Sequence, residues 1–486
     1  MQNTRPILAW ETLLDLAPAA ADAAGPGRLP ALRDRLEHAL REAIADGRLP
    51  AGAALPPSRV LADALGISRW VVTETYGRLV AEGVLDARTG SATRVSAGWA
   101  DAARPTSARA VAQDPAAGAA IAPAAPPQHP RFDLRPGIPD LHAVPRSRWT
   151  AALREGLASL PDRDLASAFP FGHPLAAAAV AGYLGRSRLI DVEAARIVIT
   201  HGATDGMALI AAALHERGHT RLLVEDPSWP RLREVARQHG LEPVPVPVDA
   251  DGIDTERLAD EAARTGARAA LVTPAHQFPL GAALHPARRE RLVSWAREAD
   301  GLIIEDDYDA EFRYDRRPIA ALQRLAPDRV VLIGSLSKSV SPALGVGWAV
   351  LPPWLSLADA PPAPSTIDQA ALTRFISSGD LERHLRRSRV RFRRRRERLL
   401  AALAERMPEL PVSGIAAGMH LVLGLPSGVV AADLIAAAPE DLALTALSRY
   451  VVASPASEAL VIGYGDLDDA LVDEAVARLA ALIRPH

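Results

Sequence analysis

A single lysine, Lys338, stands in a chain of 486 residues that otherwise uses arginine for every basic side chain. Lysine and arginine together number 55, so 54 of them are arginine. A guanidinium group stays protonated, whereas the amine of a buried lysine loses its proton readily. Lys338 is therefore a candidate for attacking a carbonyl and forming a Schiff base. The alternative is a surface lysine that survived by chance.

Other groups that could hold a charged ligand also follow strand-like runs. ITHGATDGMALIAAAL passes through a turn of small residues into a helix that begins near Ala203 and Thr204. Backbone N–H groups at such a helix start bind anions. Ser335 lies three residues before Lys338 and could offer a hydroxyl to the same anion. Because open α/β sheets bind ligands beyond the carboxyl ends of their strands, these groups are expected to share one site.

Carboxylates and aromatic rings occupy two further strand ends. IIEDDYDAEFRY carries Asp306, Asp307 and Tyr308, and VEDPSWPR carries Trp229. Pyridoxal 5′-phosphate (PLP) needs an amine, an anion site, a carboxylate that holds the pyridinium proton and a ring that stacks on its own. Each feature alone is common, since an acidic strand end is often only a solvated terminus. Their combination, in this order, predicts a PLP site.

The elements that position these groups alternate apolar runs with helical stretches. Runs apolar on both faces indicate a buried, mainly parallel sheet, and the helices between them indicate an α/β layered fold. The C-terminal third is typical of a small α+β subdomain. An arginine-rich helix over 381–407 is interpreted as a solvated face or part of a dimer contact rather than as a DNA contact. The predicted strands are RIVIT (196–200), RLLVE (221–225), AALVT (269–273), GLIIE (301–305), RVVLIG (329–334) and GWAVL (347–351).

Residues 132–483 resemble the fold-type I aminotransferases, which are PLP enzymes. The resemblance rests on FDLRPGIPDL, ITHGATDG, VEDPSWP, VTPAHQFPLG, IIEDDYDAEFRYD and GSLSKS, in that order. It implies that Lys338 forms the Schiff base with the cofactor. It implies that Asp306 pairs with the pyridine nitrogen, with Asp307 the less favoured choice. It also implies that Tyr308 bonds the ring oxygen and that Trp229 stacks on the ring.

The same resemblance implies further cofactor contacts. Ala203, Thr204 and Ser335 would surround the phosphate. Gln277 lies where the resembling proteins place a polar group near the ring oxygen.

Two arginines of the resembling proteins are absent from this chain. The usual pattern SKS-x-x-P-x-L-R-x-G has a phosphate-binding arginine where this chain has Gly345. The arginine that binds an α-carboxylate near the C-terminal strand is replaced, in ALVIGYG, by Val461. The first change removes a charge-assisted contact, and the second weakens the case for transamination. Arg231, in DPSWPR, is a candidate for binding an acidic effector, with a surface arginine the equal alternative.

The first hundred residues predict a separate domain. LRDRLEHALREAI is an amphipathic helix, with leucines four residues apart. A short helix capped by Ser58 and broken by Gly66 should follow, then a second helix capped by Ser68. VLDARTGSATRV predicts a hairpin. This order of elements is typical of a winged helix-turn-helix domain.

Residues 31–95 resemble the GntR class of bacterial DNA-binding domains, through LPPSRxLAxxLGxSRxxVxxxYxxLxxEG. The resemblance implies that the second helix enters the major groove of operator DNA. Arg59 and Arg69 would contact DNA, with Ser68 and the wing near Gly90 touching the backbone. Departures occur at residue 70, a tryptophan, and at residue 92, an alanine in the wing, so base preference and wing shape are open.

Composition bounds the remaining possibilities. Residues 101–130 are rich in Ala and Pro and predict a linker between a DNA-binding domain (1–100) and a PLP-binding domain (131–486). The chain has no cysteine, which excludes disulfides and thiolate zinc sites, and no metal site is predicted. No apolar run reaches the length of a membrane span, and the N-terminus lacks a signal-peptide pattern, so a cytoplasmic protein is expected.

A GntR-class domain followed by an aminotransferase-like domain resembles the MocR-type transcriptional regulators. The resemblance implies a homodimer that binds double-stranded operator DNA and senses PLP or an amine or amino-acid effector, with at most weak transaminase activity. The alternative is an active PLP-dependent aminotransferase with an accessory N-terminal domain. A third interpretation is a regulator that keeps the fold without PLP. The retention of Lys338 opposes it.

Overall fold

The computed structural model describes residues 10–14, 32–87, 92–97, 130–166, 168–314, 320–357, 363–453 and 457–484. Contacts divide the chain into two compact units, Met1–Ala125 and Pro126–His486. Nearly all of the predicted linker, 101–129, lies outside the described residues, so its boundaries stay a prediction. Among the described residues, no helix combines the length and the apolar character that crossing a membrane requires.

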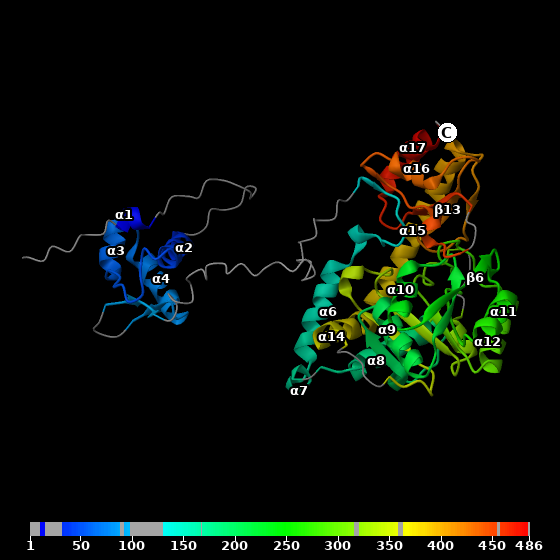
Figure 1. The fold of residues 1–486 in the computed structure, drawn as a ribbon, viewed down its shortest axis with the longest axis horizontal. Helices are drawn as coiled ribbons and strands as arrows, with labels where there is room; N and C mark the ends of the chain where they lie inside the picture. Colours follow the sequence, from blue (N-terminus) through cyan, green and yellow to red (C-terminus); the bar gives the residue numbers. More distant parts are fainter. Residues whose placement is uncertain are drawn as a thin grey trace, which may run out of the picture. The chain divides into compact units, whose positions relative to one another are not determined.

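The N-terminal unit has the predicted winged helix-turn-helix order (Figure 1). Its core is built from leucines and valines on the inner faces of three helices, and Leu36, Leu61 and Leu79 are fully buried. The two short strands pair antiparallel as the base of the wing. Its elements are α1 (Trp10–Leu13), α2 (Leu32–Ala45), α3 (Ser58–Leu65), α4 (Arg69–Ala81), β1 (Leu85–Asp86) and β2 (Arg94–Val95).

Two of the three helix boundaries that the sequence predicts, at Gly66 and Ser68, are confirmed. Ser68 caps α4, and its hydroxyl accepts a hydrogen bond from the Val71 backbone N–H at 3.4 Å. Gly66 ends α3 in the left-handed region, with φ of 63°. The predicted cap at Ser58 is wrong. Pro57 is the residue before the helix, and Ser58 is already in its first turn.

The large unit is built on an eight-stranded sheet in the order β4-β11-β10-β9-β8-β5-β6-β7. The pairs β10–β9, β9–β8, β8–β5 and β5–β6 are parallel, and β11 runs antiparallel to both of its neighbours. This confirms the predicted α/β fold with a mainly parallel sheet. The strands are β4 (Ile197–Thr200), β5 (Arg221–Asp226), β6 (Glu242–Asp249), β7 (Gly252–Ile253), β8 (Ala269–Val272), β9 (Leu302–Asp306), β10 (Val330–Ser335) and β11 (Gly347–Val350).

Helices cover the sheet and bury it (Figure 1). One apolar cluster joins the strands to α9 and α10, and another joins them to α11 and α12. The longer helices of this part are α6 (Arg146–Ser159), α8 (Pro174–Arg188), α9 (Ala203–Glu216), α10 (Pro230–Gln238), α11 (Thr255–Thr265), α12 (Pro286–Glu298) and α14 (Thr366–Ser377). Shorter turns are α7 (Asp162–Leu165), α13 (Leu322–Leu325), η1 (Leu141–Ala143), η2 (Ala194–Arg196) and η3 (Pro342–Leu344).

Strand β6 was not predicted, because its sequence EPVPVPVD carries a proline at every second position. Proline lacks the N–H that a ladder needs, so such a run argues against a strand. In a strand, however, alternate residues point their N–H groups to opposite edges. Pro243, Pro245 and Pro247 therefore all direct their missing N–H to one edge, and the alternate residues remain free to pair with β5.

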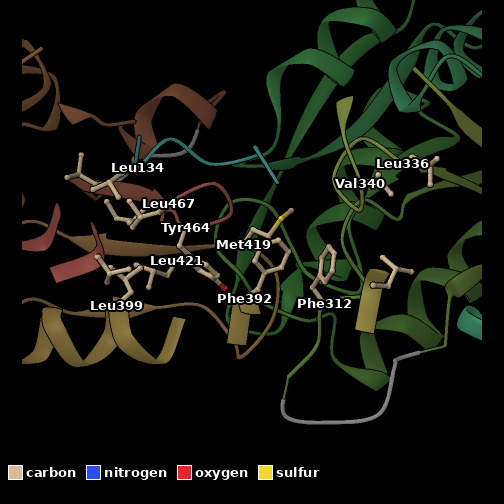
Figure 2. Packing of buried hydrophobic residues seen from close by; sticks show 14 of the residues in the cluster. Leu134, Phe312, Leu336, Val340, Phe392, Leu399, Met419, Leu421, Tyr464 and Leu467 are labelled. Atoms are coloured by element: carbon tan, nitrogen blue, oxygen red, sulfur yellow. The ribbon is translucent and has the colours of Figure 1, made fainter. Parts of the chain in front are cut away.

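The predicted small α+β subdomain is present at the C-terminal end (Figure 1). Its antiparallel sheet has the order β12-β13-β15, and β14 pairs with β3, which follows the linker. Figure 2 shows part of the apolar cluster that joins this subdomain to the large sheet, where the rings of Phe312 and Phe392 meet edge to face at 5.0 Å. The elements are β3 (Phe132–Asp133), α15 (Asp380–Arg406), β12 (Val412–Ser413), β13 (His420–Gly424), α16 (Ala431–Ala436), β14 (Leu442–Ala443), η4 (Leu447–Tyr450), β15 (Ala459–Gly463), η5 (Asp469–Leu471) and α17 (Val472–Ile483).

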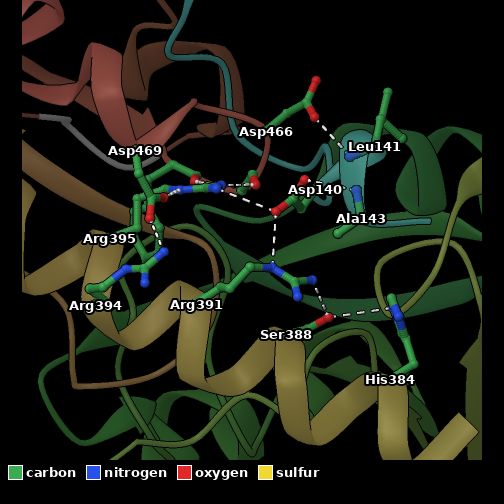
Figure 3. A network of polar contacts seen from close by, with 12 residues as sticks. Asp140, Leu141, Ala143, His384, Ser388, Arg391, Arg394, Arg395, Asp466 and Asp469 are labelled. Atoms are coloured by element: carbon green, nitrogen blue, oxygen red, sulfur yellow. Dashed lines mark hydrogen bonds and ion pairs between the residues drawn. The ribbon is translucent and has the colours of Figure 1, made fainter. Parts of the chain in front are cut away.

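Several arginines of α15 form ion pairs with carboxylates of other segments and do not only face the solvent. Arg395 is buried, and its Nε donates to Asp469 at 2.7 Å. Arg391 and Arg395 both donate to Asp140, at 3.1 and 3.3 Å (Figure 3). The interpretation of this arginine run as a solvated face is therefore wrong for Arg395, which is buried and pairs with carboxylates from distant parts of the chain, and its role in a dimer contact stays a prediction.

A buried arginine fixes the loop that follows β9. Arg188, at the end of α8, donates to Asp307 at 2.7 Å and lies 4.0 Å from Glu305. All three side chains are at least 96% buried. Glu305 also accepts backbone N–H groups of Leu322 and Gln323 at the start of α13. Buried carboxylates are tolerated only when paired in this way, so Arg188 makes the acidic segment compatible with the core.

Replacing Arg188 by leucine is expected to destabilise the large unit by about 3–5 kcal/mol, because two buried carboxylates lose their cation. The thermal unfolding midpoint of this unit should fall by at least about 5 °C. Arg186→Ala on the same helix is the control, since Arg186 is exposed and its ion pair with Glu382 is a surface pair. Equal midpoints for the two variants, measured by calorimetry, would contradict the role of Arg188.

Candidate functional site

A cavity of about 340 Å³ opens beyond the carboxyl ends of β4, β5, β8, β9 and β10. Seven of the eight residues predicted to contact the cofactor line it: Ala203, Thr204, Trp229, Asp306, Tyr308, Ser335 and Lys338. Residues that had not been singled out also line it: Pro136, Gly137, His201, Gly202, Thr273, Phe278, Asp309, Ser337, Pro342, Met419, His420 and Tyr450. The topology therefore gathers signals spread over more than 130 positions of the sequence.

Lys338 lies in the loop after β10, with its amine inside the cavity. The Nζ atom donates a hydrogen bond to the carbonyl of Gly137 and lies 5.5 Å from the centroid of the Trp229 ring. Burial lowers the pKa of Lys338, while Asp306 and Asp309 act in the opposite direction. A lowered pKa increases the fraction of neutral amine, which is the form that attacks a carbonyl.

Asp306 and Asp307 are adjacent but face different surroundings. Asp306 lines the cavity, and its Oδ1 is buried without a hydrogen-bond partner in the described part of the chain. Burial, together with Asp307 and Asp309, raises the pKa of Asp306 to about 7, and Lys338 opposes this shift. Asp307 bonds Arg188 instead. An unpartnered buried carboxylate oxygen fits a ring nitrogen that carries a proton, so Asp306 is the better of the two candidates.

The candidate phosphate site lies at the start of α9. Gly202 precedes the helix with φ of 115°, and Ala203 and Thr204 form its first turn. The N–H groups of a first turn have no partner within the helix and are available to an anion. Ser335, the last residue of β10, lines the same cavity. No arginine occurs among the described residues that line the cavity. Gly345, with φ of 56°, ends η3 and does not line it.

Tyr308 belongs to a hydrogen-bonded group that the sequence did not reveal. Its hydroxyl lies 3.0 Å from Nδ1 of His276, and the same nitrogen lies 2.8 Å from Asp309. The ring of His420 lies 5.0 Å from that of His276. Burial lowers the pKa of His420 well below its ordinary value, which keeps this ring neutral. His276 and Asp309 stand within quoted motifs, but only the fold shows that they meet Tyr308.

Gln277 is the predicted cofactor residue that the structure does not bring to the cavity. Its side-chain amide donates to the carbonyls of Pro227 and Phe278, at 2.8 and 2.7 Å. Its amide oxygen accepts the Leu280 N–H at 3.0 Å. Because these bonds hold the Gln277 side chain against the loop after β8, the position of this side chain does not support a contact with the cofactor ring.

A second cavity, of about 860 Å³, adjoins the first and shares Pro136, Trp229 and Tyr450 with it. Its walls are strongly basic, with one carboxylate, Glu234. Among the described residues, the side chains of Arg231 and Arg449 have neither a hydrogen-bond nor an ion-pair partner, whereas those of the other arginines of the wall do. The arginines that line this cavity are Arg135, Arg231, Arg233, Arg237 and Arg449.

Val461 stands where the resemblance places a carboxylate-binding arginine. Val461 is fully buried in β15, in an apolar cluster with Val422 and Tyr450. Trp229 and Phe278, which both line the cofactor cavity, pack against this cluster. This wall of the cavity is therefore apolar, and the unpaired guanidinium groups lie in the second cavity instead.

The predicted DNA-binding side chains are exposed on the N-terminal unit. Arg59 lies on α3, and Ser68 and Arg69 lie at the start of α4. Arg69 Nε is 3.5 Å from the hydroxyl of Ser58. Trp70, the departure noted in the sequence, exposes 65% of its surface beside Arg69. Gly90 lies outside the described residues, so its predicted contact is not tested.

Comparisons with known proteins match each of the two units to a protein family. Residues 32–95 match the family described as bacterial regulatory proteins, gntR family, and residues 139–479 match aminotransferase class I and II. The pyridoxine biosynthesis transcriptional regulator PdxR of Corynebacterium glutamicum is 32% identical, covering 94% of this chain and 96% of the relative. MocR of Rhizobium meliloti, a probable rhizopine catabolism regulatory protein, is also 32% identical, covering 92% of each chain.

A solved structure supports the fold of the large unit. An archaeal alanine:glyoxylate aminotransferase superposes with a TM-score of 0.66 at 22% identity, covering 73% of this chain and 91% of the other. This likeness concerns the fold alone.

These findings define a DNA-binding transcriptional regulator with an aminotransferase-like domain. The chain belongs to the GntR-family regulators of the MocR and PdxR type. The cofactor of the aminotransferase class I and II family is PLP. The cavity fits this cofactor, because it combines a buried amine, an unpartnered buried carboxylate oxygen and a helix start made of small residues.

Asp306→Asn is expected to stabilise the cofactor-free protein at pH 8, by about 2–4 kcal/mol, and to have little effect near pH 4. The pKa of Asp306 is raised in the folded state, so the folded protein binds the proton more tightly than the unfolded chain. Stability is therefore lost as the pH rises from about 4 to about 7, and asparagine removes this loss.

Denaturant unfolding between pH 4 and pH 8 measures this difference. Asp300→Asn is the control, because Asp300 is exposed and its pKa is lowered by Arg329. A stability difference between Asp306→Asn and the wild type that does not widen with pH would contradict the raised pKa.

Proposed function

We propose that the large unit binds PLP through the residues that line the first cavity. Lys338 would supply the amine, Asp306 would hold the ring nitrogen, and Tyr308 and Trp229 would contact the ring. Ala203, Thr204 and Ser335 would surround the phosphate. The observation that carries this proposal is that the only lysine of the chain and an unpartnered buried carboxylate face the same cavity. When bound, PLP supplies an aldehyde for amines and an electron-withdrawing ring.

The neighbouring cavity supports an effector that combines an amine with an acidic group. The amine would occupy the cavity of Lys338, and the acidic group would meet Arg231 and Arg449 beyond Trp229. Guanidinium groups bind carboxylates and phosphates with two parallel hydrogen bonds. The apolar wall at Val461 argues against the usual α-carboxylate site on that side, and hence against ordinary transamination.

The N-terminal unit would act as part of a homodimer in the cytoplasm, reading two half-sites of an operator. Helix-turn-helix domains place the N-terminal residues of their second helix on base edges, and dimers match the symmetry of their operators. In this chain those residues are Ser68, Arg69 and Trp70, and all three are exposed. An effector changes operator affinity only if it binds one arrangement of the dimer more tightly than another.

Arg69→Ala is expected to weaken operator binding about tenfold or more, because a guanidinium contact to a base or a phosphate is lost. Binding would be measured at fixed salt on a sequence selected from random DNA. Arg78→Ala is the matched control, since Arg78 lies near the other end of α4 and pairs with Glu37. Equal losses in the two variants would contradict the assignment of the helix start to DNA.

Lys338→Ala and Lys338→Arg should both lose the visible absorption band that PLP gives when attached to a lysine. Arginine keeps the charge but offers no amine that can react, so loss in both variants separates chemistry from charge. A compound with an amine and an acidic group is expected to change the wild-type band. A band that persists in either variant would refute Lys338 as the anchor, and no band in the wild type would refute PLP binding.

A further inference from the structure

A third cavity, of about 310 Å³, lies between the first turn of α6 and the first half of α15. None of its lining residues lines the cofactor cavity or the second cavity. Arg148 comes from α6, and Arg383, Arg387 and Arg391 come from α15. The only carboxylate described in its wall is that of Asp380.

The charges in this wall are not balanced. Asp380 lies 2.9 Å from Arg383 and 3.8 Å from Arg148, so one carboxylate serves two guanidinium groups. Arg391 pairs with Asp140 at 3.1 Å. The side chain of Arg387 is exposed and has no hydrogen-bond or ion-pair partner among the residues that the structure describes. The wall therefore carries an excess of positive charge in a concave space.

The start of α6 adds further donors to the same space. Pro145 precedes this helix, and no side chain caps it. Pro145, Ser147 and Arg148 all line the cavity, which places the first turn at its wall. The Arg146 N–H bonds the carbonyl of Val144 at 2.8 Å, which leaves the N–H groups of Ser147 and Arg148 as the first-turn donors without a described partner, and this end of the helix dipole is positive. The hydroxyl of Ser147 offers one more donor.

We propose that this third cavity binds a phosphate group. A phosphate carries two negative charges near neutral pH and several acceptor oxygens, which match the excess guanidinium groups and the free helix donors. The volume suits inorganic phosphate or a small phosphate ester, since ligand pockets begin at about 300 Å³. The site does not depend on the proposed PLP site, because the two cavities share no residue.

Two contacts connect the third cavity to the cofactor cavity. Arg391 reaches Asp140, and His384, which also lines the third cavity, bonds the carbonyl of Ser339 at 2.9 Å (Figure 3 shows Arg391, Asp140 and His384). Ser339 follows Lys338. Asp140 follows the segment that carries Pro136 and Gly137 along the cofactor cavity. A phosphate that draws Arg391 away from Asp140 would therefore loosen one wall of the cofactor cavity.

Titration calorimetry with inorganic phosphate tests the site on the full-length protein with PLP added. PLP fills the phosphate site at α9, so added phosphate is left to bind elsewhere. Arg387→Ala should weaken phosphate binding about tenfold, the loss expected for one charge-assisted contact. Arg386→Ala is the matched control, because Arg386 is the exposed neighbour on the same helix and does not line the cavity. It should change binding less than about twofold.

The same two variants distinguish a small phosphate compound from the phosphates of DNA. If the phosphate belongs to a small compound, Arg387→Ala weakens phosphate binding and leaves operator affinity equal to that of Arg386→Ala. If it belongs to DNA, Arg387→Ala alone lowers operator affinity and reduces the salt slope by about one. The proposal is overturned if the two variants are equal in both assays, or if the wild type shows no saturable phosphate binding and no such operator effect.

Discussion

The burial of Arg188 between Glu305 and Asp307 is the interaction on which the cofactor cavity depends. Side chains alternate along β9 and its extension, so Glu305 and Asp307 point to one face and Asp306 points to the other. Because Arg188 binds the outer two, the middle carboxylate is the one that faces Lys338. Arg188, together with the charge of the nearby Arg289, thus makes this acidic core tolerable and determines which acid faces the cavity.

The charges of the cofactor cavity are unbalanced without a ligand. Burial raises the pKa of Asp306 to about 7 and lowers the pKa of Lys338, and it also raises to about 7 the pKa of Glu225, which bonds the cavity residue Thr273. A ligand with complementary charge would stabilise groups whose pKa values are shifted in this way. Such shifts are frequent at functional sites. The two arginine-rich cavities have other walls, so the acidic groups that are proposed to bind there would lie apart from the amine of Lys338.

Much of this arrangement was predictable from local sequence, because seven of the eight residues predicted to contact the cofactor lie near the ends of predicted strands, and the topology brings these ends together. The misses have physical causes. Strand β6 was missed because it contains three prolines. Only their spacing of two residues shows that all three face the same edge of the strand. Gln277 has the polar amide that a cofactor contact needs, but this amide bonds the backbone of its own loop. The arginines of α15 resemble a solvated face, and their carboxylate partners lie up to 255 positions away. His276 and Asp309 meet Tyr308 only through the fold.

The segment 130–141 enters the large unit directly from the region that joins it to the DNA-binding unit. It pairs with β14 through β3, passes Pro136 and Gly137 along the cofactor cavity, and ends in the bonds of Asp140 to α15. One stretch of backbone is thus both the covalent attachment of the operator-reading unit and a wall of the ligand cavity. Thermodynamic reciprocity then applies: whatever factor an effector imposes on operator affinity, the operator must impose on effector affinity. The genome itself would be a ligand that tunes this cavity.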